Sequence, residues 1–159
     1  MKKIKSLDQF INENVVKTSS GLAIVFNGTV LLAHTTGRNF KTGYGIPKGG
    51  IEVGETNIDA AIREVEEEIG VKVSKNMITS NSYQFIVDSK WGKKIVHYFI
   101  VEIKDLSDIG LKEPKIPKSR LQLEEINDAR FLDLRSAQMV IMHSQIPVID
   151  NLQKLGLLK

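Results

Sequence analysis

Residues 49–71 read GGIEVGETNIDAAIREVEEEIGV and hold the clearest pattern in the chain. Apolar side chains recur at helical spacing across 57–69, which predicts an amphipathic helix. Thr56 or Asn57 is suited to cap the start of this helix, and Gly70 is suited to end it. The residues on the apolar stripe, which should face a core, are Ile58, Ala61, Ile62, Val65 and Ile69.

A second face of this helix gathers three carboxylates, those of Glu64, Glu67 and Glu68. Like charges at these spacings repel by roughly a few tenths of a kcal/mol per pair, so a positive group should offset them. Arg63 lies one turn before Glu67 and can supply that charge on an ordinary solvated face. An oxygen-rich, sulfur-free cluster after a glycine-rich loop equally suits a hard cation, Mg²⁺ or Mn²⁺, shared with substrate phosphates.

Length and composition limit the class of protein. The chain has 159 residues, which fits a single domain over 1–159. It contains no cysteine, so disulfide frameworks, thiolate zinc sites and cysteine nucleophiles are excluded, and a reducing cytoplasm fits. No apolar run approaches the length of a membrane span. A net charge of +3 permits anionic small molecules as ligands without requiring nucleic acid.

The rest of the chain mixes strand and helix patterns, which predicts an α/β layered domain. Asn27-Gly28, between two apolar runs, is a strong β-hairpin signal within 21–34. Glycines and a proline predict a loop over 35–50, and the lysines of 104–120 are interpreted as a solvated surface loop. Strands are also expected at 83–88, 94–103 and 129–132, and helices at 1–14, 135–143 and 147–157.

Residues 49–71 resemble the signature of the Nudix hydrolases. That signature runs Gly, five residues, Glu, seven residues, Arg-Glu, an aliphatic residue, any residue, Glu-Glu, any residue, Gly and an aliphatic residue. The residues at the fixed positions are Gly49, Glu55, Arg63, Glu64, Val65, Glu67, Glu68, Gly70 and Val71. The preceding segment 44–49, YGIPKG, and Glu125 six residues before Phe131 extend the likeness.

The resemblance implies a Nudix fold, an α/β/α sandwich around a mixed sheet in which the signature forms a loop, a helix and a loop. It implies a Mg²⁺-dependent pyrophosphohydrolase, with Mn²⁺ as a substitute, acting on a nucleoside diphosphate linked to another moiety. Dinucleoside polyphosphates, ADP-ribose and similar compounds, and nucleoside triphosphates stay open as substrates. The alternatives are a noncatalytic module that binds nucleotides or regulates, and a pyrophosphohydrolase of RNA 5′ ends.

The resemblance also assigns roles to residues. The implied Mg²⁺ ligands are Glu64, Glu67, Glu68 and the Gly49 carbonyl oxygen. Arg63 and Glu55 are implied to pair and to hold the loop against the helix. Such positioning, together with electrostatics, does most of the work in phosphoryl chemistry. The general base stays open between Glu64 and a later glutamate, Glu125 or Glu124, for which an exposed acidic loop is an equal interpretation.

Three residues before the helix are candidates for substrate binding. Lys48 and Arg38 can contact phosphate, although solvated side chains are the simpler interpretation of each. Tyr44 can stack on a base or sugar, or pack at the edge of the loop.

The N-terminal segment 5–14, KSLDQFINEN, resembles the short head-targeting peptides of internal proteins in large tailed bacteriophages. An ordinary amphipathic helix explains the same residues. The expected location is therefore the cytoplasm of a cell or of a phage-infected host. Homodimers are frequent among Nudix proteins, and the sequence leaves the oligomeric state open.

Overall fold

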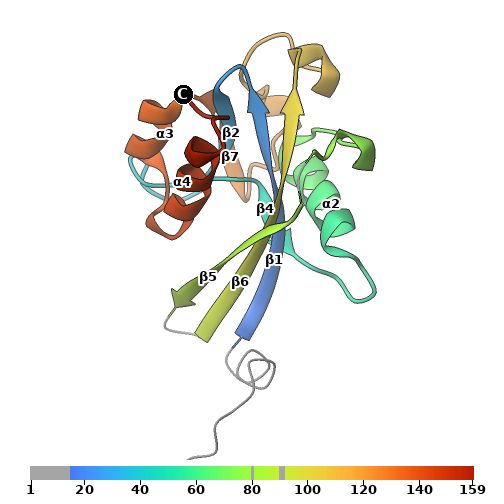
Figure 1. Cartoon of the computed structure of the whole chain (residues 1–159), viewed down its shortest axis with the longest axis vertical. Coiled ribbons are helices and arrows are strands. Elements are labelled where there is room, and N and C mark those ends of the chain that lie inside the picture. The colour runs from blue at the N-terminus through green and yellow to red at the C-terminus, as the bar shows by residue number, and fades with distance from the viewer. Residues whose placement is uncertain (1–14, 80, 90–91) are drawn as a thin grey trace, which may run out of the picture.

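The computed structural model describes residues 15–79, 81–89 and 92–159, so the helix predicted for 1–14 lies outside the described residues. Seven strands form one sheet (Figure 1). They are β1 (Val15–Phe26), β2 (Thr29–Thr35), β3 (Tyr44–Gly45), β4 (Lys48–Gly50), β5 (Tyr83–Ser89), β6 (Gly92–Ile103) and β7 (Ile126–Leu132). The main path runs β3-β2-β1-β6-β5, with β4 paired to β1 and β7 paired to β2.

The predicted hairpin joins β1 to β2 through Asn27 and Gly28, with φ angles of 48° and 76°. Two central residues with positive φ match the turn that the strand twist favours, which is why Asn-Gly is suited to this position. β1 then pairs with β6 in parallel along its length, while the other strand pairs are antiparallel. The sheet is therefore mixed, as predicted.

Helices cover both faces of this sheet, because its central strands are apolar on both sides. In β1, Leu22 and Ile24 belong to one core, and Ala23 and Val25 belong to the other. The first core packs against α2 (Asn57–Ile69) and the irregular 104–121 segment. The second packs against α3 (Leu134–Val140) and α4 (Ile146–Lys154). Figure 1 shows α2 on one side of the sheet and α3 with α4 on the other, which confirms the α/β/α sandwich.

Helix α2 has the predicted bounds. The Thr56 hydroxyl accepts a hydrogen bond from the Asp59 N–H at 3.1 Å and so caps the start of the helix. Gly70 ends it with a φ of 66°, and its N–H donates to the Glu66 carbonyl at 2.9 Å. No helix in the described ranges is long and apolar enough to cross a membrane.

Two expectations for the strands were incomplete. The segment 35–50 is not loop throughout, because it contains the short strands β3 and β4. β1 begins at Val15 and β7 at Ile126, each earlier than the apolar runs indicated. The added residues at the start of β1 and β7 pair with β6 and β2, which are distant in the sequence. The local residue pattern therefore gives little indication that these residues form strand.

Candidate active site

Strand β4 brings the backbone of Gly49 into direct contact with helix α2. It pairs antiparallel with β1, with Gly49 opposite Ser20. A Cβ atom placed on Gly49 would lie 2.1 Å from the carboxylate carbon of Glu64, so any side chain here would force that carboxylate out of its place. The glycine that begins the Nudix signature therefore lets the loop backbone reach the first glutamate of the helix.

Arg63 joins this loop to the helix. Its Nε and Nη2 atoms donate to the two carboxylate oxygens of Glu55 at 2.8 and 2.9 Å, which confirms the predicted pair. Nη2 also donates to the Gly50 carbonyl oxygen at 2.9 Å. Nη1 donates to Glu64 at 2.9 Å and to Glu67 at 3.1 Å. The hydrogen bonds from Arg63 to Glu55, with one from the Glu52 N–H, lower the pKa of Glu55 to about 2. The Arg63 contacts use the planar, forked geometry that only arginine provides.

The glutamate cluster, defined as Glu64, Glu67 and Glu68, extends from the core boundary to solvent. Glu68 is 7% exposed, whereas the Glu67 side chain is 53% exposed. Burial, together with the negative charges of Glu64 and Glu125, raises the pKa of Glu68 to about 8. Burial also raises the pKa of Glu64, against the opposing effect of Arg63. The protein neighbours of the cluster thus stabilise the ionised forms of Glu64 and Glu68 only in part.

Glu125 lies close enough for its charge to act on Glu64 and Glu68. Its side chain is exposed, and its carbonyl oxygen accepts from the Thr36 N–H at 2.8 Å. The same turn is tied to α2, since the Gln122 N–H donates to the Glu68 carbonyl oxygen at 2.9 Å. Of the two candidates on this turn, Glu125 is the one whose charge acts on the cluster.

The donor set of the cluster suits a hard divalent cation, since it consists of carboxylates next to a backbone carbonyl with no sulfur or imidazole. The raised pKa of the buried Glu68 points the same way, because it shows that the protein alone stabilises the ionised carboxylate poorly. In residues 15–79, 81–89 and 92–159, however, no three acidic, histidine or cysteine side chains are already arranged to hold a metal ion. Arg63 accounts for this, because Glu64 and Glu67 both accept from its Nη1 atom. A metal ion would therefore require these carboxylates to turn.

A cavity of about 450 Å³ opens beside the loop that carries Gly49. We call it the cationic cleft. Its positive residues are Lys17, Arg38, Lys48 and Lys94, and its apolar residues are Phe85, Val87, Val96 and Met142. Lys48 and Arg38 are substrate-binding candidates from the sequence, whereas no sequence pattern indicated Lys17 and Lys94. These two come together only because β1 and β6 pair in parallel, with Lys17 opposite Lys94, and no local pattern reports that pairing.

Lys48 lies between the cleft and the glutamate cluster. Its side chain is half-buried, and its backbone N–H donates to the Glu68 carboxylate. Burial lowers the pKa of the Lys48 ammonium, the charge of Glu68 opposes that effect, and the other cleft cations add to it. The arrangement places a cation beside the acidic helix, where a phosphate group can touch both.

Tyr44 does not reach the cationic cleft. Its ring is 6% exposed and packs near His34, with the ring centroids 5.1 Å apart. Its hydroxyl donates to the buried Asp128, and burial with this hydrogen bond raises the pKa of Tyr44 to about 12. The structure therefore gives Tyr44 a place in the core, and we assign it no contact with substrate.

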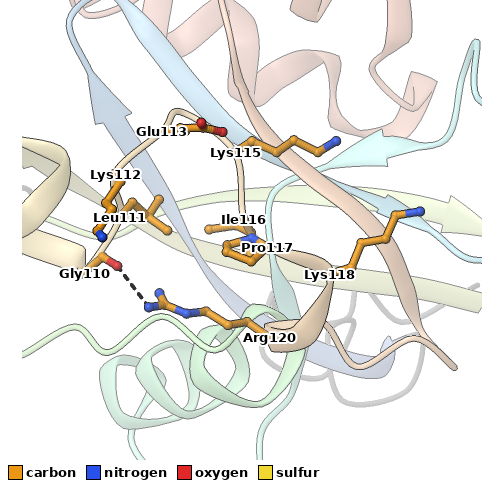
Figure 2. Close-up of a pocket in the computed structure, with 9 residues that line it drawn as sticks. All are labelled: Gly110, Leu111, Lys112, Glu113, Lys115, Ile116, Pro117, Lys118 and Arg120. Atoms are coloured by element: carbon orange, nitrogen blue, oxygen red, sulfur yellow. Dashed lines mark hydrogen bonds between the residues drawn. The ribbon is translucent and has the colours of Figure 1, made fainter.

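A second hollow, of about 540 Å³, lies in the loop around residues 110–120 and contains no residue of the Nudix signature (Figure 2). Figure 2 shows Lys115 and Lys118 pointing away from Arg120. The Arg120 guanidinium donates to the Gly110 carbonyl oxygen at 2.9 Å. Because these exposed cations diverge, the hollow fits the predicted solvated loop.

The fold and the site together define an α/β/α protein in which an arginine ties a glutamate-rich helix to a glycine loop. The NUDIX domain model matches residues 17–151, and the chain belongs to the Nudix family. A curated relative, a putative mutator protein MutT4 of Mycobacterium tuberculosis, is 36% identical over 76 residues. That match covers 46% of this chain and 31% of the relative, less than a third of its length.

Solved structures share the fold at low identity. An Ap4A hydrolase of C. elegans in a binary complex has a TM-score of 0.64 and 19% identity, over 88% of this chain and 97% of its own. A MutT NUDIX hydrolase from Burkholderia pseudomallei has a TM-score of 0.63 and 18% identity, and the match covers 84% of this chain and 95% of that one. A bifunctional NMN adenylyltransferase/ADP ribose pyrophosphatase from Francisella tularensis has a TM-score of 0.66 and 16% identity. This match covers 89% of this chain and 42% of that one.

Proposed function

We propose that the chain is a Mg²⁺-dependent pyrophosphohydrolase that cleaves a phosphoanhydride bond in a nucleoside diphosphate linked to another moiety. One observation carries this proposal. The Arg63 guanidinium contacts Glu55, Glu64 and Glu67 at 2.8–3.1 Å and so assembles the glutamates of the signature beside Gly49. A noncatalytic module has no need of this complete set, and its presence favours the enzyme over that alternative.

The residues that would hold the divalent ion are Glu64, Glu67, Glu68 and the Gly49 carbonyl oxygen. The ion supplies positive charge and Lewis acidity beside the scissile phosphate, and Mn²⁺ can take its place. Arg63 and Glu55 act as positioning residues, because they fix the loop and the helix against each other. Charge neutralisation and alignment supply most of the acceleration in such reactions.

The chemical step is the attack of water on phosphorus. A bond forms between the water oxygen and phosphorus, the bridging P–O bond breaks, and the phosphate on its far side leaves. Glu64 is the proposed acceptor of the water proton, since burial raises its pKa and makes it a better base. Glu125 is the alternative, because its charge acts on the same cluster from the neighbouring turn.

The cationic cleft supplies the proposed substrate contacts. Lys48 and Arg38 would bind phosphate, and the apolar wall that includes Phe85 suits a nucleobase. The structural relatives named above include an Ap4A hydrolase and a bifunctional NMN adenylyltransferase/ADP ribose pyrophosphatase, which keeps both substrate types in consideration. Activity on RNA 5′ ends stays an alternative prediction. Formation of a homodimer and a cytoplasmic location also stay predictions.

A substrate panel tests this proposal. Purified protein is incubated with dinucleoside polyphosphates, ADP-ribose, nucleoside triphosphates and 5′-triphosphate RNA in Mg²⁺, Mn²⁺ or EDTA, and the products are resolved by ion-exchange chromatography. The proposal predicts hydrolysis of at least one nucleotide with a divalent ion and none in EDTA. Tight binding without hydrolysis would instead identify the noncatalytic module.

A further inference from the structure

The cationic cleft concentrates positive charge next to the glutamate cluster. Among the described residues, its lining includes four cations and no aspartate or glutamate. Other lysines in the described part of the chain have carboxylate partners, such as Lys75 with Asp59 at 3.0 Å and Lys93 with Asp88 at 3.9 Å. Across those same described residues, none of the four cleft cations forms an ion pair within 4.0 Å.

Two of these cations lie where a phosphate chain would extend from the glutamate cluster. Lys17 passes over the glycine loop, with its Cε atom 3.4 Å from the position of a Cβ on Gly50. Gly50 in turn accepts from Arg63 and follows Gly49, which contacts Glu64. Lys94 stands opposite Lys17 in the neighbouring strand. The row of positive charge therefore begins at the cluster and continues across two strands.

Like charges gathered in a partly enclosed hollow repel one another, and a polyanion with matching charges removes that cost. A substrate with two phosphate charges needs only the metal site and one or two of these cations. We infer that Lys17 and Lys94 are specificity-determining residues that make the protein prefer phosphate chains with four or more negative charges over diphosphates with two. This inference rests on the proposed function, since it concerns the substrate of the same site.

Steady-state kinetics across a charge series tests the inference. The series is ADP-ribose, diadenosine triphosphate, diadenosine tetraphosphate and diadenosine pentaphosphate, which keeps adenosine constant while the phosphate charge rises. We expect kcat/KM to rise at least about tenfold from ADP-ribose to the tetraphosphate and to fall with added salt, as charge-steered binding does. Lys17→Gln and Lys94→Gln should each lower kcat/KM for the tetraphosphate roughly tenfold and change ADP-ribose less than about threefold.

Lys93→Gln is the matched control. Lys93 directly precedes Lys94 in β6, but it pairs with Asp88 and is not among the residues that line the cleft. It should leave the charge preference unchanged. Equal loss on every substrate in the Lys17 and Lys94 variants, or no preference in the unsubstituted chain, would overturn the inference and leave the pyrophosphohydrolase intact.

Calorimetric binding of the same series to the Glu64→Gln variant separates the two failures. If no compound is hydrolysed, the proposed function is wrong, but the affinity series still decides the inference. Affinity that rises with phosphate charge and falls in the Lys17→Gln background would support it, and a flat series would contradict it.

Discussion

At the scale of single residues, Arg63 determines the geometry of the site. Its guanidinium contacts two carboxylates of the helix and one carboxylate and one carbonyl of the loop. The pair with Glu55 is bidentate and largely shielded, since the Glu55 side chain is 14% exposed. Such a fork gives direction as well as charge, which lysine cannot reproduce.

Arg63→Lys should therefore lower kcat by about 10²-fold through misplaced glutamates, as small displacements at a reacting centre do. It should also weaken the response to Mg²⁺. The free energy of unfolding should change by no more than about 1–2 kcal/mol. The measurements are kcat against Mg²⁺ concentration and urea unfolding.

Glu55→Gln should have the same effect, because it removes the same interaction from the other side. A double-mutant cycle in kcat then gives a double variant little worse than either single one. Additive losses would show that the two residues act independently, and Arg63 would be reassigned to direct contact with phosphate.

The buried Glu68, a proposed metal ligand, should also make the free energy of unfolding depend on pH. Its pKa in the folded protein is about 8, above the ordinary value of 4.5, because the side chain is buried beside other carboxylates. The folded state thus binds this proton more tightly than the unfolded state. In EDTA, the stability contributed by the protonated side chain is present below pH 4.5 and is lost as the pH rises to about 8.

Glu68→Gln should remove that loss and stabilise the protein in EDTA at pH 8 by roughly 1–3 kcal/mol, while abolishing activity. Mg²⁺ should raise the melting temperature of the unsubstituted chain at pH 8 and leave that of the variant nearly unchanged. Thermal unfolding at pH 5 and pH 8 checks both statements. A variant that is less stable than the original at pH 8 in EDTA would show that Glu68 is already well neutralised by the protein.

At the scale of elements, α2 was the part that the sequence predicted best. Its period, its Thr56 cap and its Gly70 end are local features, so the bounds Asn57–Ile69 follow from the residues themselves. Ala61, Val65 and Ile69 do enter the core. The helical wheel could not show that Glu68 is buried while Glu67 is half-exposed, because that difference depends on how the helix is rotated against the sheet.

Two neighbouring glutamates of α2, Glu67 in the cluster and Glu66 outside it, should differ in their effect on activity. Glu67→Gln should lower kcat by about 10²–10⁴-fold, the range for losing charge stabilisation. Glu66→Gln should be nearly silent, because Glu66 is exposed and its ion pair with Lys72, at 4.0 Å, is a weak surface contact. The comparison needs kcat at saturating Mg²⁺ and substrate. Similar damage from both substitutions would mean that the face assigned to the cluster is wrong.

At the scale of the whole molecule, the site depends on contacts that no short stretch of sequence encodes. The loop glycine meets the helix because β4 pairs with β1, and Lys17 meets Lys94 because β1 pairs with β6. The alternation of Leu22 and Ile24 with Ala23 and Val25 indicates burial on both faces but not which strand lies alongside. The signature residues were therefore predictable, whereas the cleft that faces them was not.

The central claim is that the acidic face of α2 directs metal-dependent attack of water on a phosphoanhydride. Hydrolysis in ¹⁸O-labelled water, followed by mass spectrometry of the phosphate products, tests it most directly. We predict one ¹⁸O atom per cleavage in the presence of Mg²⁺ and no labelled product in EDTA. Glu67→Gln should form labelled product about 10²–10⁴-fold more slowly, and Glu66→Gln at nearly the rate of the unsubstituted chain. Labelled product formed at the unsubstituted rate in EDTA, or by Glu67→Gln, would contradict the claim.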